Sequence, residues 1–158
     1  MPTLWSVERT PTARPASVVV IPYGLLFCSI AARDIPATII DSDDASVAFF
    51  DIEPFQDGHT LVISRKHVTS VLDDDGELGR ISPMVTKVAR RLVDSLGASG
   101  VNIISNAGES AGQSVHHLHI HVIPRYDREP GINAIRSAMP RRPLEEVAAM
   151  VTGESNRK

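Results

Sequence analysis

Short apolar runs separated by turn-forming residues mark three strands between residues 38 and 63. The runs Thr38–Ile40, Val47–Ile52 and Thr60–Ile63 are rich in β-branched and aromatic residues. An acidic turn at residues 41–44 and a loop that ends at Gly58 separate them. Because such short connections cannot carry a parallel crossover, we expect an antiparallel meander.

After the three strands, apolar residues recur every three or four positions, which is the period of an amphipathic helix. They are Leu78, Ile81, Val85, Val88, Leu92 and Leu96. Gly97 is expected to end this helix. Pro83 interrupts the pattern and predicts that the regular helix starts with Ser82 as its N-cap.

The remaining patterns are shorter. Val101–Ile104 and His117–Ile123 are predicted strands, and Pro124 is expected to end the second. The segment Leu25–Ala32 fits either a short helix or a strand, and Leu144–Val151 fits a short amphipathic helix. Three strands, a helix and two further strands predict an α+β domain.

The length of 158 residues favours a single folded domain, which we place at residues 23–126. Residues 1–22 contain four prolines without periodicity, which predicts a poorly ordered extension. Residues 127–158 form a C-terminal tail in this division. The apolar run near residue 20 is too short to span a bilayer, so no membrane association is expected.

Charge and cysteine content narrow the classes of function further. The net charge is −3, and no basic stripe indicates a nucleic-acid-binding surface. Cys28 is the only cysteine, which excludes an intramolecular disulfide framework. A reducing compartment, and hence a cytoplasmic location, is the expectation.

Four of the six histidines lie between residues 116 and 121. Since side chains alternate along a strand, His117, His119 and His121 are expected to share one face, and His116 the other. Such a triplet fits a solvated edge strand, a three-histidine metal site, or a nucleophile with anion-binding neighbours. The loop Asn106–Ser114 brings amide and hydroxyl donors beside the triplet, which favours binding of a phosphate group.

The segment Gln113–Arg125 resembles the signature of the histidine-triad (HIT) superfamily of nucleotide hydrolases and transferases. Residues 27–30, 34–37, 48–52 and 58–63 match its other landmarks in order. The resemblance implies an α+β fold with a five-stranded antiparallel sheet, one long helix and a short N-terminal helix. It also implies a homodimer in which the two sheets join.

The resemblance assigns roles to individual residues. His119 would be the nucleophile, His117 and His121 would bind phosphate oxygens or the leaving group, and His59 would stand beside the triad. Ser114 would help to protonate a leaving amine. The α-phosphate of the nucleotide would be bound by Asn106, Gly112, Gln113 and Ser114. Asp51 would bind the ribose hydroxyls. The purine base would lie between Phe27, Ile35, Phe49 and Ile52.

We expect no metal to be required. Zinc-binding relatives carry Cys-x-x-Cys, but here Leu25 stands three residues before Cys28. Zinc is therefore not favoured, although His59 and His121 are candidate ligands. The expected reaction is hydrolysis of a purine nucleoside phosphoramidate to the monophosphate through a nucleotidyl-histidine. The alternatives are cleavage of dinucleoside polyphosphates, a low-turnover nucleotide-binding module and a metal-dependent hydrolase.

Overall fold

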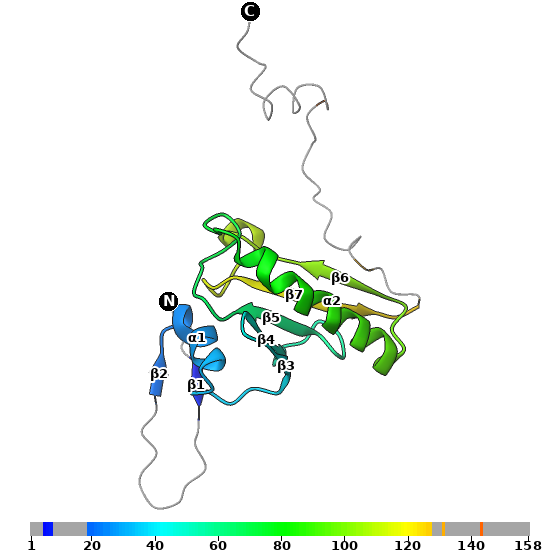
Figure 1. The fold of residues 1–158 in the computed structure, drawn as a ribbon, viewed down its shortest axis with the longest axis horizontal. Helices are drawn as coiled ribbons and strands as arrows, with labels where there is room; N and C mark the ends of the chain where they lie inside the picture. Colours follow the sequence, from blue (N-terminus) through cyan, green and yellow to red (C-terminus); the bar gives the residue numbers. More distant parts are fainter. Residues whose placement is uncertain (1–4, 8–18, 128–130, 132–142, 144–158) are drawn as a thin grey trace, which may run out of the picture.

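The computed structural model describes residues 5–7, 19–127, 131 and 143. Its centre is a five-stranded sheet in the order β3-β4-β5-β7-β6, in which every pair of neighbours is antiparallel (Figure 1). The strands are β3 (Ile39–Ser42), β4 (Ser46–Phe50), β5 (Thr60–Ser64), β6 (Gly100–Ile104) and β7 (His119–Arg125). The long helix is α2 (Glu77–Leu96). The α+β class, the antiparallel sheet and the single long helix are confirmed.

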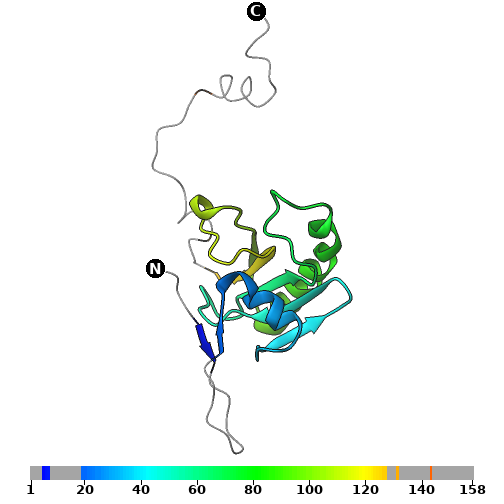
Figure 2. The same ribbon diagram turned by 90° about the vertical axis from the view of Figure 1, so that its left-hand side faces the viewer.

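The ambiguous segment near residue 28 is a helix. It forms η1 (Tyr23–Leu25) and α1 (Leu26–Ala31). A second 3-10 turn, η2 (Glu109–Ala111), lies in the loop between β6 and β7. Figure 2 looks onto the end of the molecule where α1, in blue, faces the viewer, with the yellow-green loop before β7 above it.

The sheet buries its two faces against different elements. Ala48, Val62, Ile120 and Val122 pack with α2, which contributes residues such as Ile81 and Val88. The alternate positions Val47, Phe49, Leu61 and Ile63 pack with Phe27, Ile30 and Ile35. Because strand side chains alternate, His119 and His121, paired with Ile63 and Leu61, lie on the α1 face.

The predicted start of the long helix at Ser82 is wrong. The helix begins at Glu77, and the Asp74 carboxylate accepts the backbone N–H groups of residues 76, 77 and 78. This side chain satisfies donors that a helix start leaves unpaired. Pro83 therefore lies inside α2, where the Ser82 hydroxyl donates to the carbonyl of Gly79 that a proline at 83 cannot engage.

The boundaries of the last strand also differ from the prediction. Strand β7 begins at His119 rather than His117, because the N–H of Leu118 donates to the carbonyl of Val68, outside the sheet. Strand β7 also continues through Pro124 to Arg125. Pairing with β5 ends at Val122, so the missing N–H of proline interrupts no bond of that ladder.

Two short strands lie in the predicted N-terminal extension. They are β1 (Trp5–Val7) and β2 (Val19–Ile21), which pair antiparallel, and the sequence pattern had not indicated them. The predicted helix at residues 144–151 lies outside the described residues. Within the described part of the chain, no helix is both long and apolar enough to cross a membrane.

Candidate active site

His119 is the first residue of β7, and its imidazole is buried on the α1 face. The side chain is 5% exposed, and the Phe27 ring meets it edge-on at a centroid distance of 5.1 Å. Nδ1 lies 2.6 Å from the backbone carbonyl oxygen of His117. Since a carbonyl only accepts, the proton is on Nδ1 and the lone pair is on Nε2.

Burial keeps this imidazole neutral. It lowers the pKa of His119, and the opposing effects of the hydrogen bond to the His117 carbonyl and of the Asp51 carboxylate are smaller. A neutral imidazole with a defined lone pair is a competent nucleophile at neutral pH, because no separate base has to remove a proton first.

His121, two residues further along β7, is oriented by a chain of hydrogen bonds. The backbone N–H of Phe55 donates to Nδ1 of His59 over 3.1 Å, so the proton of His59 is on Nε2. That Nε2–H donates to Nδ1 of His121 over 2.9 Å. His121 consequently presents an Nε2–H donor.

The surroundings keep His59 and His121 uncharged. Burial, and then the neighbouring imidazoles of His119 and His59, lower the pKa of His121 to about 4. Burial also lowers the pKa of His59, against the attraction of the Asp51 carboxylate, whose Oδ2 lies 3.7 Å from His59 Nε2. The neutral Nε2–H of His121 matches a phosphoryl oxygen without a change of protonation state.

His117 is placed differently from the expectation that it would bind phosphate. Its ring is fully buried, and its Nε2–H donates to the carbonyl of Ser64 over 2.7 Å. Its Nδ1 lies 3.3 Å from His67 Nδ1 and 3.4 Å from Cys28 Sγ. Both ring nitrogens are thus engaged inside the protein, and it is the backbone carbonyl of His117 that touches the site.

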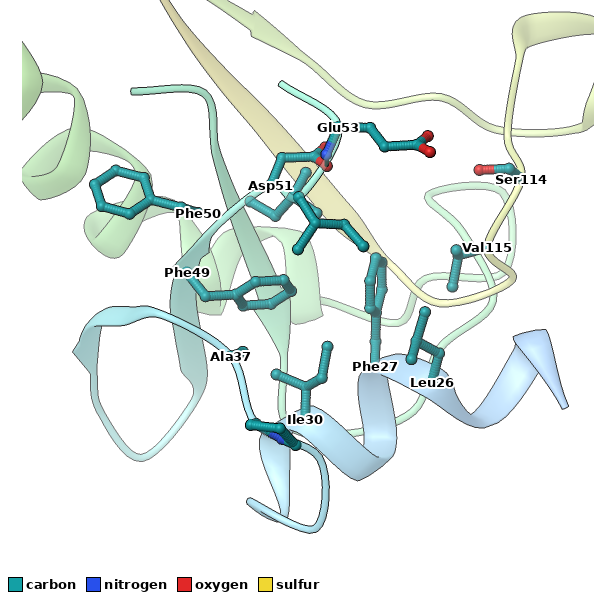
Figure 3. Close-up of a pocket in the computed structure, with 13 residues that line it drawn as sticks. Leu26, Phe27, Ile30, Ala37, Phe49, Phe50, Asp51, Glu53, Ser114 and Val115 are labelled. Atoms are coloured by element: carbon teal, nitrogen blue, oxygen red, sulfur yellow. Dashed lines mark hydrogen bonds between the residues drawn. The ribbon is translucent and has the colours of Figure 1, made fainter. Parts of the chain in front are cut away.

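A pocket opens between α1 and the end of β4, and one of the residues that line it, Phe27, contacts the His119 ring. Among the residues that line it are five of those predicted to bind nucleotide, namely Phe27, Phe49, Asp51, Ile52 and Ser114 (Figure 3). Phe27 and Phe49 meet edge-on at 5.7 Å, and Ile52 is 70% exposed. Ile35 does not line the pocket but packs in the apolar cluster behind it.

Several lining residues escaped the sequence analysis. They are Leu26, Ile30, Pro36, Ala37, Phe50, Glu53, Leu61 and Val115. The spacing of Phe27 and Ile30 on one face of a helix would have indicated Ile30, once the helix was preferred over a strand. Nothing in the sequence pattern indicated Glu53.

The predicted phosphate loop is held by Gln113. Its side-chain amide donates to the carbonyls of Thr69 and Val115 and accepts the N–H of Gly108, and the residue is 5% exposed. The amide is therefore committed to the backbone. Gly112 has a φ of +86°, which favours glycine, and a Cβ there would lie 3.9 Å from the amide nitrogen of half-buried Asn106.

Two groups of side chains offer three ligand atoms each for a metal ion. Cys28, His67 and His117 have ligand atoms 3.3–3.4 Å apart, close to the spacing of about 3.3–3.6 Å that tetrahedral zinc requires. They fit three corners of a zinc site. The second group is Asp51, His59 and His121. The N–H of Phe55 donates to Nδ1 of His59, so the proton of His59 is on Nε2, the nitrogen that faces the other two ligands. A metal ion therefore does not fit there.

The family model described as HIT domain matches residues 32–128. The chain belongs to the HIT family. HIT-family proteins are hydrolases and transferases of nucleotide derivatives, and they bind nucleotide substrates. The triad and most of the residues that line the pocket lie within this match.

Several HIT relatives match most of this chain. Protein hit of Bacillus subtilis is 41% identical over 111 residues, which cover 70% of this chain and 77% of that protein. The protein named adenosine 5'-monophosphoramidase hnt1 in Schizosaccharomyces pombe is 34% identical, with 79% and 91% covered.

Two solved HIT structures show the same fold. A HIT-family protein from Bacillus subtilis superposes with a TM-score of 0.69 at 33% identity, covering 84% of this chain and 96% of that one. A zinc-bound histidine-triad protein from Mycobacterium smegmatis gives a TM-score of 0.63 at 32% identity, also covering 84% and 96%.

Proposed function

We propose that this HIT domain hydrolyses purine nucleoside phosphoramidates of the AMP-amine type through a nucleotidyl intermediate on His119. The observation that carries the proposal is the hydrogen bond from His119 Nδ1 to the His117 carbonyl. It leaves the Nε2 lone pair of a neutral, buried imidazole beside a pocket with an apolar floor and a carboxylate, Asp51, for the ribose hydroxyls.

In the first step, Nε2 of His119 forms a bond to the α-phosphorus, and the bond from phosphorus to the amine nitrogen breaks. The amine leaves with that electron pair and takes the proton of the Ser114 hydroxyl. The Nε2–H of His121 donates to a phosphoryl oxygen and stabilises the charge that develops there.

In the second step, a water molecule attacks the phosphorus and displaces Nε2 of His119. Its proton returns to Ser114, which is exposed to solvent. The products are the nucleoside monophosphate, the free amine and the unchanged enzyme. His117 acts in both steps through its carbonyl, and His59 acts by fixing the proton of His121.

No metal takes part in these steps. Cys28, His67 and His117 would hold a zinc ion, which would supply a structural cross-link between α1, the segment after β5 and the segment before β7. We also retain the homodimer as part of the proposal, since β6 is an edge strand with Ile103 48% exposed, and light scattering in solution tests it. The lone cysteine supports a cytoplasmic location.

The test is chemical trapping. Rapid acid-free quenching during turnover of an AMP-amine is expected to reveal an adenylylated peptide spanning Ser114 to Arg125. His119→Ala is expected to bind AMP but to lose turnover by orders of magnitude, whereas His116→Ala, at an exposed neighbouring position, keeps it. Normal turnover by His119→Ala would refute the proposal. Faster cleavage of a diadenosine polyphosphate than of an AMP-amine would favour the alternative function, hydrolysis of dinucleoside polyphosphates.

A further inference from the structure

We propose that Glu53 selects the leaving group: its carboxylate favours phosphoramidates whose amine portion carries a second, positively charged nitrogen and disfavours polyanionic leaving groups. The inference rests on the proposed phosphoramidate chemistry. It assigns to Glu53 a role in specificity and not in the bond-breaking steps.

The first observation is where Glu53 lies. It follows β4 in the loop that carries Asp51, and its backbone N–H donates to Asp51 Oδ1 over 2.9 Å. This contact holds the start of the loop at the mouth of the pocket. Figure 3 shows the Glu53 carboxylate and the Ser114 hydroxyl pointing toward one another from opposite sides of that mouth.

The second observation concerns charge. Among the described residues that line the pocket, Asp51 and Glu53 are the charged ones, and both are acidic. Asp51 has its Oδ1 occupied by the loop and its Oδ2 near His59. The Glu53 carboxylate is exposed and faces the place where Ser114 would protonate the departing amine.

The chemical consequence follows from the direction of attack. In the proposed reaction the leaving group departs opposite His119 and takes its proton from Ser114. Because the Glu53 carboxylate faces that hydroxyl, we place the outer end of the leaving group near Glu53. An ammonium group there gains a favourable interaction, while the phosphates of a departing nucleotide are repelled. An exposed ion pair of this kind changes kcat/KM by up to about fivefold and is weakened by salt.

The test compares three substrates. The first is AMP joined through one nitrogen to 1,4-diaminobutane, which leaves a free ammonium group. The second is AMP joined to pentylamine, which is similar in size and neutral, and the third is diadenosine triphosphate. At low ionic strength we expect the wild-type protein to prefer the first over the second by about three- to fivefold.

The variants separate a local effect from net charge. Glu53→Gln is expected to bring the preference to near one and to increase cleavage of diadenosine triphosphate several-fold. Asp44→Asn removes one negative charge at an exposed turn outside the pocket and is expected to keep the wild-type preference. A preference that survives in Glu53→Gln, or that is lost equally in Asp44→Asn, overturns the assignment of Glu53.

The substrates also distinguish this inference from the proposed function. Turnover of both phosphoramidates at equal rates by the wild-type protein contradicts the role of Glu53 and leaves the proposed reaction intact. If the wild-type protein turns over neither phosphoramidate, this result contradicts the proposed reaction and, with it, the inference.

Discussion

Acidification from pH 7.5 to pH 5 is expected to destabilise the fold through the histidines of the candidate active site. Burial lowers the pKa values of His59, His117, His119 and His121 below the ordinary value of 6.5. The unfolded chain therefore binds more protons than the folded chain over this interval. Such groups contribute stability that is complete above pH 6.5 and is lost as the pH falls toward their folded-state pKa values.

The size of the effect can be worked out from His121, whose pKa is lowered from 6.5 to about 4. At about 1.4 kcal/mol per pKa unit, the full shift corresponds to about 3 kcal/mol. About 2 kcal/mol of this is lost between pH 6.5 and pH 5, where the imidazole is protonated in the unfolded chain alone. The pKa values of the other three histidines are lowered as well, so these groups act in the same direction.

Acidic residues contribute little in this interval. The pKa values of Asp41, Asp43 and Asp75 are lowered from an ordinary value of 3.8, chiefly by hydrogen bonds from Lys87 for Asp41 and from Lys66 for Asp75. For Asp43, hydrogen bonds from Ser46 and its neighbours outweigh burial, the largest single influence, which raises its pKa. Carboxylates of this kind lose their stabilising contribution only below about pH 5.

The assay is urea unfolding at fixed protein concentration at pH 7.5, 6.5 and 5. We expect the free energy of unfolding to fall by about 2 kcal/mol. In His121→Gln the pH-dependent loss should shrink by about 2 kcal/mol. His116→Gln, which removes an exposed imidazole, should keep the wild-type profile. A stability that is flat or increases toward pH 5, or an unchanged profile in His121→Gln, would refute the reasoning.

Three further substitutions test the packing behind the site by thermal and urea unfolding. Pro83→Ala should stabilise the protein by about 1 kcal/mol, since it restores the backbone N–H donor to the Gly79 carbonyl inside α2, for which the Ser82 hydroxyl now substitutes. Gly58→Ala should destabilise it by about 1–3 kcal/mol, because φ is +88° and the new Cβ would lie 2.5 Å from Leu96 Cδ1. Gln113→Glu should lower the free energy of unfolding by about 3 kcal/mol or more, since a buried carboxylate would face two carbonyls. For each of the three variants, an unfolding midpoint equal to that of the wild-type protein would contradict the expectation.

The sequence indicated the elements of the domain well and their ends poorly. Alternating strands and a 3.6-residue period report which face is buried, and Ile120 and Val122 do pack against α2 as their alternation predicts. Helix ends depend on single polar contacts. Asp74 caps α2 from outside the apolar pattern, and the Ser82 hydroxyl compensates for Pro83, so neither effect is visible in hydrophobic periodicity.

Within the site, residue types were predictable and their partners were not. The pocket brings Phe27, Phe49, Asp51 and Ser114 together as the resemblance implied. The contacts of Gln113 could not be inferred, because both carbonyls that its side chain engages belong to backbone whose position depends on the folded loops. The roles of Phe27, Phe49, Asp51 and Ser114 in binding substrate stay predictions.

The displacement of His117 from the strand explains how the tautomer of His119 is set. Had β7 continued through His117, the carbonyl of that residue would have pointed along the sheet toward a neighbouring strand. Because the chain leaves the ladder at Leu118, that carbonyl turns onto Nδ1 of His119, and the His117 ring turns inward to the Ser64 carbonyl. The backbone carbonyl of His117 thus fixes the tautomer of His119, two residues further along the chain. His119 and His121 are also two residues apart, but both lie in β7 and share one face of the sheet.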